Sequence, residues 1–152
     1  RQMCIRDSYL LALRQVPEPM LAAFKVAGWT YRIDFNYISE LSKQLNMSCI
    51  GATSYGQKTI YISEASATLH EFGHFLDWML GFPAEYEQLF RAEAAAAPLR
   101  NYAKTNAREY FADCFDYCII HGNDSKMMEI LRKNAPQTCT YFEELKKDNW
   151  SR

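Results

Sequence analysis

The sequence His70-Glu71-Phe72-Gly73-His74 constrains this chain of 152 residues more than any other feature. A helix has about 3.6 residues per turn, so His70 and His74 lie on one face and both imidazoles can reach one metal ion. Glu71 lies about 100° around the helix from His70, where it can act as general base toward a metal-bound water. The motif predicts a Zn²⁺ site that hydrolyses peptide bonds.

The residues on both sides of the motif predict a helix that carries it. Residues 59–63 are rich in β-forming residues and indicate a short strand. Ser63 or Ser66 can then cap the following helix. This helix should run to Leu80, because Gly81-Phe82-Pro83 follows directly.

A catalytic zinc ion needs three protein ligands and an open fourth position. Glu109 is our candidate third ligand, and Asp113 follows it one helical turn later. Such an acidic pair is usually the solvated edge of an amphipathic helix. Because the motif supplies only two of the three ligands, we favour Glu109 as a ligand. Asp113 could hold a ligating histidine in place by a hydrogen bond, and Asp77 competes for that role. His121 is the other candidate ligand, although it precedes Gly122 in a turn expected to face solvent.

These residues resemble the catalytic domain of anthrax lethal factor and its relatives, which include the clostridial Pro-Pro endopeptidases. The motif contains phenylalanine and glycine, as in lethal factor. Residues 109–115 are similar to the family's Glu-Phe-Phe-Ala-Glu helix, whose first glutamate is the third zinc ligand, although Asp113 replaces the family's usual Glu. Residues 133–138 resemble a closing segment in which proline starts a helix. Tyr102 matches a family tyrosine whose hydroxyl stabilises the reacting carbonyl oxygen.

The resemblance implies a zinc endopeptidase, with Pro-Pro-type specificity as one expectation. It also implies an α+β, zincin-like fold in which a small sheet packs on a helix-rich body that includes the zinc helix. We expect one domain over residues 1–152, with residues 1–8 foreign or disordered. By resemblance the protein is secreted, although the chain carries no signal peptide, and a cytoplasmic location is the alternative.

The remaining elements are predicted from periodicity and turn residues. Strands are expected at residues 30–35, from residue 49 onward, and at 59–62; helices are expected at 19–27, 37–45 with Asn36 as cap, 84–97, 125–133 and 137–147. A peptide or protein substrate should bind extended along a sheet edge. Either residues 50–54 or residues 59–62 would supply that edge.

Composition excludes several other kinds of partner. The net charge of −1 and the pI near 6.3 give no electrostatic case for nucleic acid or for an anionic membrane. We expect a monomer. The five cysteines are an odd number without a paired framework, which favours free thiols that pack as small apolar groups. A metal site at Cys114 and Cys118 is the weaker interpretation, since no second pair has suitable spacing.

Two other functions stay open. One is an intracellular regulatory metallopeptidase that acts on a phage-type repressor, since such enzymes also combine His-Glu-x-x-His with a downstream glutamate. Tyr102 and the closing segment argue against it. The other is a binding module that keeps the fold without turnover. Zinc stoichiometry together with a digest of a peptide library would separate these functions.

Overall fold

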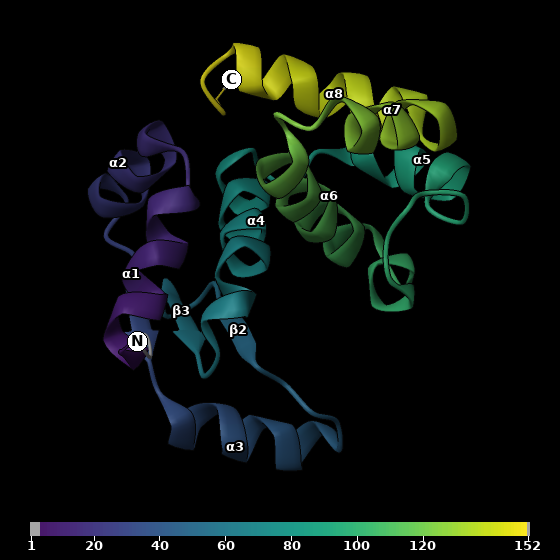
Figure 1. Cartoon of the computed structure of the whole chain (residues 1–152). Helices are drawn as coiled ribbons and strands as arrows, with labels where there is room; N and C mark the ends of the chain where they lie inside the picture. Colours follow the sequence, from purple (N-terminus) through teal and green to yellow (C-terminus); the bar gives the residue numbers. More distant parts are fainter. Residues whose placement is uncertain (1–3, 152) are drawn as a thin grey trace. The chain divides into compact units, whose positions relative to one another are not determined.

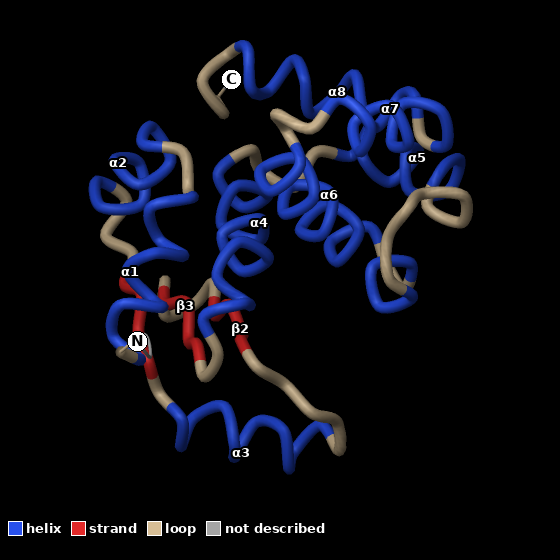
Figure 2. The backbone as a smooth tube through the Cα atoms, in the orientation of Figure 1, coloured by secondary structure: helices blue, strands red, loops and turns tan. Residues whose placement is uncertain are grey.

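Short strands and helices alternate in the first half of the chain, and helices alone form the second half (Figures 1 and 2). The computed structural model describes residues 4–151. It confirms the α+β class, with one three-stranded sheet. The chain divides into two compact units, Arg1–Phe72 and Gly73–Arg152. Because the boundary falls inside one helix, α4 (Thr68–Met79), each unit contains part of the motif. The single domain stays a prediction.

Within residues 4–72, the first unit contains the start of α4 and the following elements before it: α1 (Ile5–Gln15), α2 (Glu18–Val26), β1 (Thr30–Ile33), α3 (Phe35–Leu45), β2 (Gly51–Ser54), β3 (Thr59–Ile62) and the 3₁₀ turn η1 (Ala65–Ala67). Helix α1 was not predicted. We expected residues 1–8 to be foreign or disordered, whereas residues 5–8 form the start of α1; residues 1–3 lie outside the described part. The Tyr9 hydroxyl donates to the Ser63 carbonyl at 2.6 Å, which connects α1 to the residue that directly follows β3.

Strand β3 is the centre of the sheet. It pairs in parallel with β1 and antiparallel with β2, so the strand order is β1-β3-β2. Ile60 and Ile62 of β3 are fully buried. The suggestion that residues 59–62 could receive a substrate strand is therefore wrong, because both edges of β3 are already paired. Of the two candidate edges, only β2 lies at the side of the sheet.

The start of α3 differs from the prediction. Asp34, and not Asn36, caps this helix: its Oδ1 accepts the backbone N–H of Tyr37 at 2.9 Å. Both residue types are strong caps, but Asp34 is still extended, with φ −146°, and the helix begins at the next residue. Of the two candidate caps before the zinc helix, Ser63 is wrong, because its hydroxyl donates to the Ile50 carbonyl at 3.1 Å. Ser66, the other candidate, lies inside η1.

The second unit consists of the end of α4 followed by helices. These are α5 (Ala84–Glu93), the 3₁₀ turn η2 (Asn101–Lys104), α6 (Ala107–His121), α7 (Ser125–Asn134) and α8 (Pro136–Lys147). Helix α4 ends as predicted: Gly81 takes φ 76°, and the Phe82 N–H donates to the Asp77 carbonyl at 2.9 Å. The core of this unit is largely aromatic, with Tyr86, Tyr110, Phe111, Phe115 and Phe142 almost completely buried.

Helix α5 ends at Glu93, four residues before the predicted end. The Glu93 carboxylate is buried and accepts the backbone N–H groups of Gln137 at 3.0 Å and Thr138 at 2.7 Å. It also accepts the Thr138 hydroxyl at 2.7 Å. Helix α8 has no side-chain cap of its own, so a residue distant in sequence satisfies its first N–H groups. This capping helps to explain why helix α8 begins at Pro136, within the closing segment.

Helices α4 and α6 approach each other closely at Gly73. A Cβ atom at this position would lie 2.7 Å from the Ala112 Cα and 2.9 Å from the Ala112 carbonyl oxygen. Both atoms belong to the backbone, so neither can move away as a flexible side chain could. The small residue inside the motif therefore sets the separation of the two helices that carry His74 and Glu109.

We expect Gly73→Ala to destabilise the protein by about 1–3 kcal/mol, as overpacking does. Urea unfolding followed by circular dichroism would measure this change. Gly56→Ala is the matched control, since a Cβ there meets nothing within 4 Å. Equal stability of the two variants would show that α4 and α6 can separate without cost.

Candidate metal centre

Helix α4 presents the two histidines of the motif one turn apart. His70 and His74 are only 6% and 7% exposed, in a helix that is otherwise rich in buried apolar residues. An imidazole buried at this level needs a polar partner. Because the two residues are four apart, their imidazole nitrogens, which can act as metal ligands, lie on one helix face, as predicted from the sequence.

Helix α6 brings Glu109 to His74 within the second unit. Asn106 caps α6 and accepts the Glu109 backbone N–H at 2.9 Å, which places Glu109 in the first turn. The Glu109 Oε1 lies 2.8 Å from the His74 Nε2. The ligand atoms of His70, His74 and Glu109 all lie within 4.8 Å of one another. These three residues form a candidate metal-binding group, and it is the group expected from the sequence.

The donor set fits zinc. Two imidazole nitrogens and one carboxylate oxygen are the protein ligands of many catalytic zinc sites, and three ligands leave a fourth position open. His121 is not part of the group; its ring packs against Tyr117, with centroids 4.6 Å apart, at the end of α6. The group therefore needs no further histidine to reach three ligands.

Glu71 lies beside the group. Its Oε2 is 4.0 Å from the His70 Nε2, and the residue is 5% exposed. Its Oε1 accepts the Thr53 hydroxyl at 2.9 Å. The carboxylate thus has one oxygen held by the sheet and the other directed toward a metal-binding nitrogen.

Asp77 is buried next to His74, three residues further along α4. Arg108 donates to its Oδ1 at 2.9 Å, while Oδ2 has no hydrogen-bond partner within the described residues. Burial raises the pKa of Asp77 to about 7, and the charges of Arg108 and His74 offset part of that effect. The predicted role of Asp77 in orienting His74 stays a prediction, but the pair with Arg108 was not visible in the sequence.

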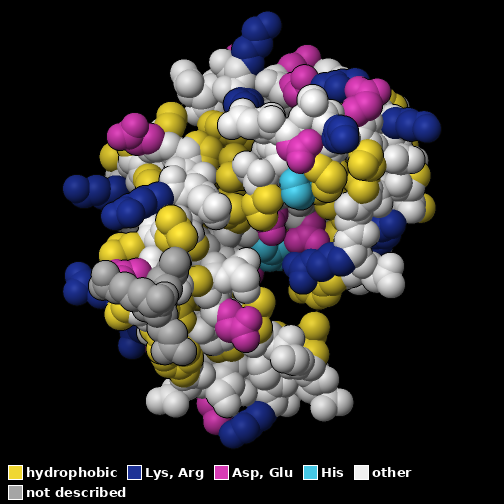
Figure 3. All heavy atoms as spheres, in the orientation of Figure 1, with side chains coloured by type: hydrophobic (Ala, Val, Ile, Leu, Met, Phe, Trp, Pro, Cys, Tyr) yellow, Lys and Arg dark blue, Asp and Glu magenta, His cyan; other side chains and the backbone are white. Residues whose placement is uncertain are grey.

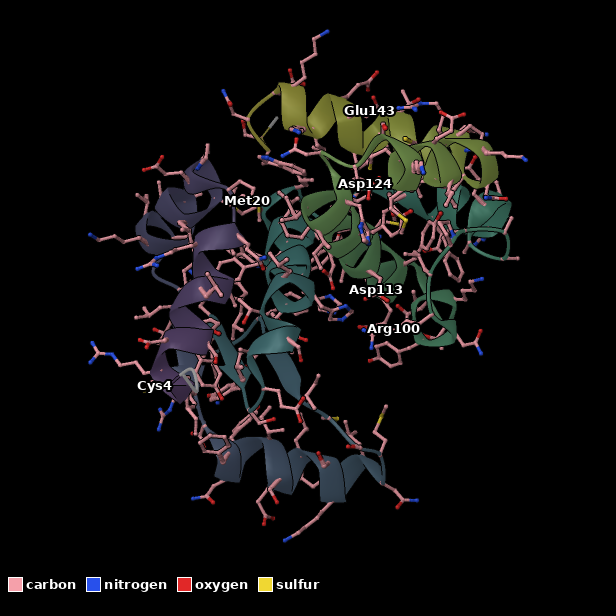
Figure 4. All side chains as sticks on the ribbon, viewed as in Figure 1. Cys4, Met20, Arg100, Asp113, Asp124 and Glu143 are labelled. Atoms are coloured by element: carbon pink, nitrogen blue, oxygen red, sulfur yellow. The ribbon has the colours of Figure 1, made fainter. Side chains whose placement is uncertain are left out.

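Asp113 also has an arginine partner that the sequence did not indicate. Arg100 donates to it through Nε at 2.7 Å and through the guanidinium NH2 at 3.0 Å, so the pair is bidentate. Figure 4 labels both residues in the second unit, where Arg100 approaches α6. This hydrogen bond raises the pKa of Arg100. A contact between Asp113 and a ligating histidine stays a prediction.

Tyr102 lies on η2 with its ring facing the same arginine. The Arg100 guanidinium carbon is 5.1 Å from the centre of the Tyr102 ring, a distance at which a cation attracts an aromatic face. Tyr102 is 40% exposed. The ring is therefore held on one side and accessible on the other, which is compatible with a hydroxyl that contacts a substrate.

The cysteines take no part in the group. All five are free thiols, and Cys114, Cys118 and Cys139 are buried. Burial raises the pKa of each of these three thiols, to about 11 for Cys139, so they remain neutral. Within residues 4–151 the histidine–glutamate group is the one cluster found that could hold a metal ion. The expectation that the cysteines pack as small apolar groups fits the buried Cys118, whereas Cys4 is exposed and the Cys139 thiol donates to the Glu143 Oε1 at 3.2 Å.

The surface agrees with the nearly neutral composition. Positive and negative side chains are interspersed on the face drawn in Figure 3. No helix in the described part of the chain is both long enough and apolar enough to cross a bilayer.

The part of the chain that matches a known family includes the residues of this site. The family model described as "Anthrax toxin lethal factor, N- and C-terminal domain" matches residues 34–145. This range is about three quarters of the chain and contains both histidines, Glu71, Tyr102 and Glu109. No curated protein matches the chain. Because the family model spans well over half of the sequence, the chain belongs to the anthrax toxin lethal factor family of domains.

Proposed function

We propose that this protein is a zinc-dependent endopeptidase with a zincin-like catalytic fold. One observation carries the proposal: His70, His74 and Glu109 bring three zinc-type ligand atoms within 4.8 Å of one another, and the Glu71 carboxylate lies 4.0 Å from one of them. A site that only bound metal would not need a second buried carboxylate at that position.

Each residue then has a chemical task. His70, His74 and Glu109 would hold the zinc ion, which when bound supplies a Lewis acid that polarises a carbonyl group and acidifies water. Glu71 accepts a proton from the attacking water and later returns it to the leaving amine. The Tyr102 hydroxyl donates to the oxygen of the carbonyl as negative charge develops on it.

Strand β2 is the proposed binding edge for an extended substrate. The Ile50 carbonyl accepts the Ser63 N–H at 2.9 Å, and Gly51 lies opposite Ile62. Hydrogen-bonded and non-hydrogen-bonded pairs alternate in an antiparallel ladder. The backbone groups of Gly51 and Thr53 therefore point away from β3, where a peptide can pair with them. Their position next to Glu71 would place a bound peptide beside the general base.

Metal removal tests this function. We expect the purified chain to cleave members of a proteome-derived peptide library, to lose cleavage after treatment with a chelator, and to regain it with about one equivalent of zinc. The cleaved sequences would give the specificity, including whether Pro-Pro bonds are preferred. Cleavage that survives complete removal of metal would contradict the proposal, and zinc binding without cleavage would identify a binding module. Secretion remains an expectation from the family resemblance.

A further inference from the structure

We propose that Thr53 is a positioning residue that connects the substrate-binding edge of β2 to the general base Glu71. This inference rests on the proposed function, because it assigns a role to a contact of Glu71. It concerns residues of the first unit only. Neither the family match nor the sequence motif assigns a function to Thr53.

The contact itself is short and sheltered. The Thr53 Oγ1 donates to the Glu71 Oε1 at 2.9 Å, and the Glu71 backbone carbonyl lies farther away, at 3.4 Å. A hydroxyl has one proton to donate, so the shorter contact to the carboxylate is the favoured hydrogen bond. A hydrogen bond to a charged acceptor in a poorly solvated position is stronger than one between neutral groups. It restricts the last rotation of the Glu71 side chain and leaves Oε2 on the side of His70.

Gly51 makes room for this arrangement. It lies two residues before Thr53, so both positions face the same side of β2. A Cβ at Gly51 would lie 3.0 Å from the Glu71 Cγ, 3.2 Å from its Oε2 and 2.9 Å from the Ala67 Cβ. On this face of β2, positions 51 and 53 both adjoin Glu71. Thr53 contributes a hydroxyl, and Gly51 leaves space because it has no side chain.

The side chain and the backbone of Thr53 point in different directions. Its side chain holds Glu71, while its backbone N–H and C=O lie on the outer edge of β2, as the alternation of the ladder requires. A peptide that pairs with this edge would contact the backbone of the residue that orients the base. We infer that the register of the bound peptide and the position of Glu71 are fixed by one residue, so that an aligned scissile bond meets a correctly placed carboxylate.

Substitution of the hydroxyl separates these two interactions. Thr53→Val removes the donor and keeps the shape and the backbone edge. We expect kcat to fall about 10- to 100-fold, as when a catalytic group is misplaced by about 1 Å, with KM within about twofold of wild type. Thr53→Ser should restore most of kcat. Thr59→Val, on β3 with its hydroxyl bonded to the Gln57 carbonyl, is the matched control and should behave as wild type.

A second readout does not depend on turnover. In metal-free protein, the carboxyl-carbon NMR resonance of Glu71 should shift in Thr53→Val and stay in place in Thr59→Val, while calorimetry should give an unchanged affinity for a substrate peptide. If Thr53→Val does not fold, Thr53→Ala supplies the test, because it removes the same hydroxyl donor to Glu71 and keeps the backbone edge of β2; the Glu71 resonance should shift in this variant as well.

Three results would overturn the inference. The first is wild-type kcat and an unmoved Glu71 resonance in Thr53→Val, together with an inactive Glu71→Gln; the enzyme would then stand and only the role of Thr53 would fail. The second is an active Glu71→Gln, which removes the general base from the mechanism and overturns the proposed function along with the inference. A Thr53→Ser variant as slow as Thr53→Val would also count against it, since packing by the methyl group would then be the cause.

Discussion

Replacing Glu71 with glutamine should lower kcat for peptide hydrolysis by at least about 10²-fold while the zinc ion and the fold are retained. Glutamine has nearly the same shape, and its amide oxygen can still accept the Thr53 hydroxyl. It cannot accept a proton from water, because an amide is not a base at neutral pH. The loss should therefore fall on the chemical step, with KM close to wild type.

The measurement is steady-state hydrolysis of a cleaved library peptide, with zinc content and circular dichroism recorded on the same samples. Glu87→Gln is the matched control, because Glu87 lies on α5 in an exposed pair with Arg91. We expect that control to keep wild-type kcat. A Glu71→Gln variant with more than about a tenth of wild-type turnover would lie far above the loss expected for a general base, and another base would have to be sought.

Tyr102→Phe should lower kcat and kcat/KM together by about 10²–10³-fold, or about 3–4 kcal/mol, the scale for one lost donor to an oxyanion. A donor that acts only on the developing negative charge contributes nothing to ground-state binding, so KM should stay nearly unchanged. Phenylalanine keeps the ring that faces the Arg100 guanidinium, so the variant removes the hydroxyl and little else. Zinc content should remain full, because the phenol is outside the ligand group.

Tyr37→Phe is a suitable control, since Tyr37 stacks on Tyr61 in the first unit with ring centroids 3.6 Å apart. It should leave kcat unchanged. Two outcomes in Tyr102→Phe would refute the transition-state role: wild-type kcat, or loss of zinc together with activity. The lethal factor resemblance would then describe the fold and not this residue.

The metal-binding group could be predicted because its information is local. His70 and His74 share a helix face by spacing alone, and Glu109 follows the asparagine that caps its helix. A catalytic zinc site needs three protein ligands, so one more ligand was required besides the two histidines. A helix fixes the spacing of its own residues, so errors in other elements do not change which residues of α4 share a face.

The sequence could not reveal the arginine partners of Asp77 and Asp113. Arg100 is 13 residues before Asp113, and Arg108 is 31 residues after Asp77. No periodicity connects residues at such separations. The family's usual Glu is Asp113 here, and its carboxylate receives a bidentate arginine. The contact between Thr53 and Glu71 could not be predicted either. The order β1-β3-β2 decides which strand lies beside the motif, and the sequences of short strands do not determine that order.

Boundaries were least predictable where two signals compete. Asp34 and Asn36 are both good caps, and only the end of β1 selects the first. The alanines after Glu93 favour helix, yet α5 ends at Glu93, whose carboxylate caps α8. At Asp34 the backbone N–H donates to the Ile62 carbonyl at 3.0 Å. This tertiary contact outweighs local propensity, which contributes only a few tenths of a kcal/mol per residue.

The zinc content of the purified chain tests the central claim most directly. Wild type and His121→Ala should each bind one zinc ion per chain after dialysis against buffer, since His121 packs on Tyr117 away from the group. His74→Ala and Glu109→Ala should each lose most of the metal, because two protein ligands cannot complete the site. Full zinc occupancy in Glu109→Ala, with the fold intact by circular dichroism, would contradict the account.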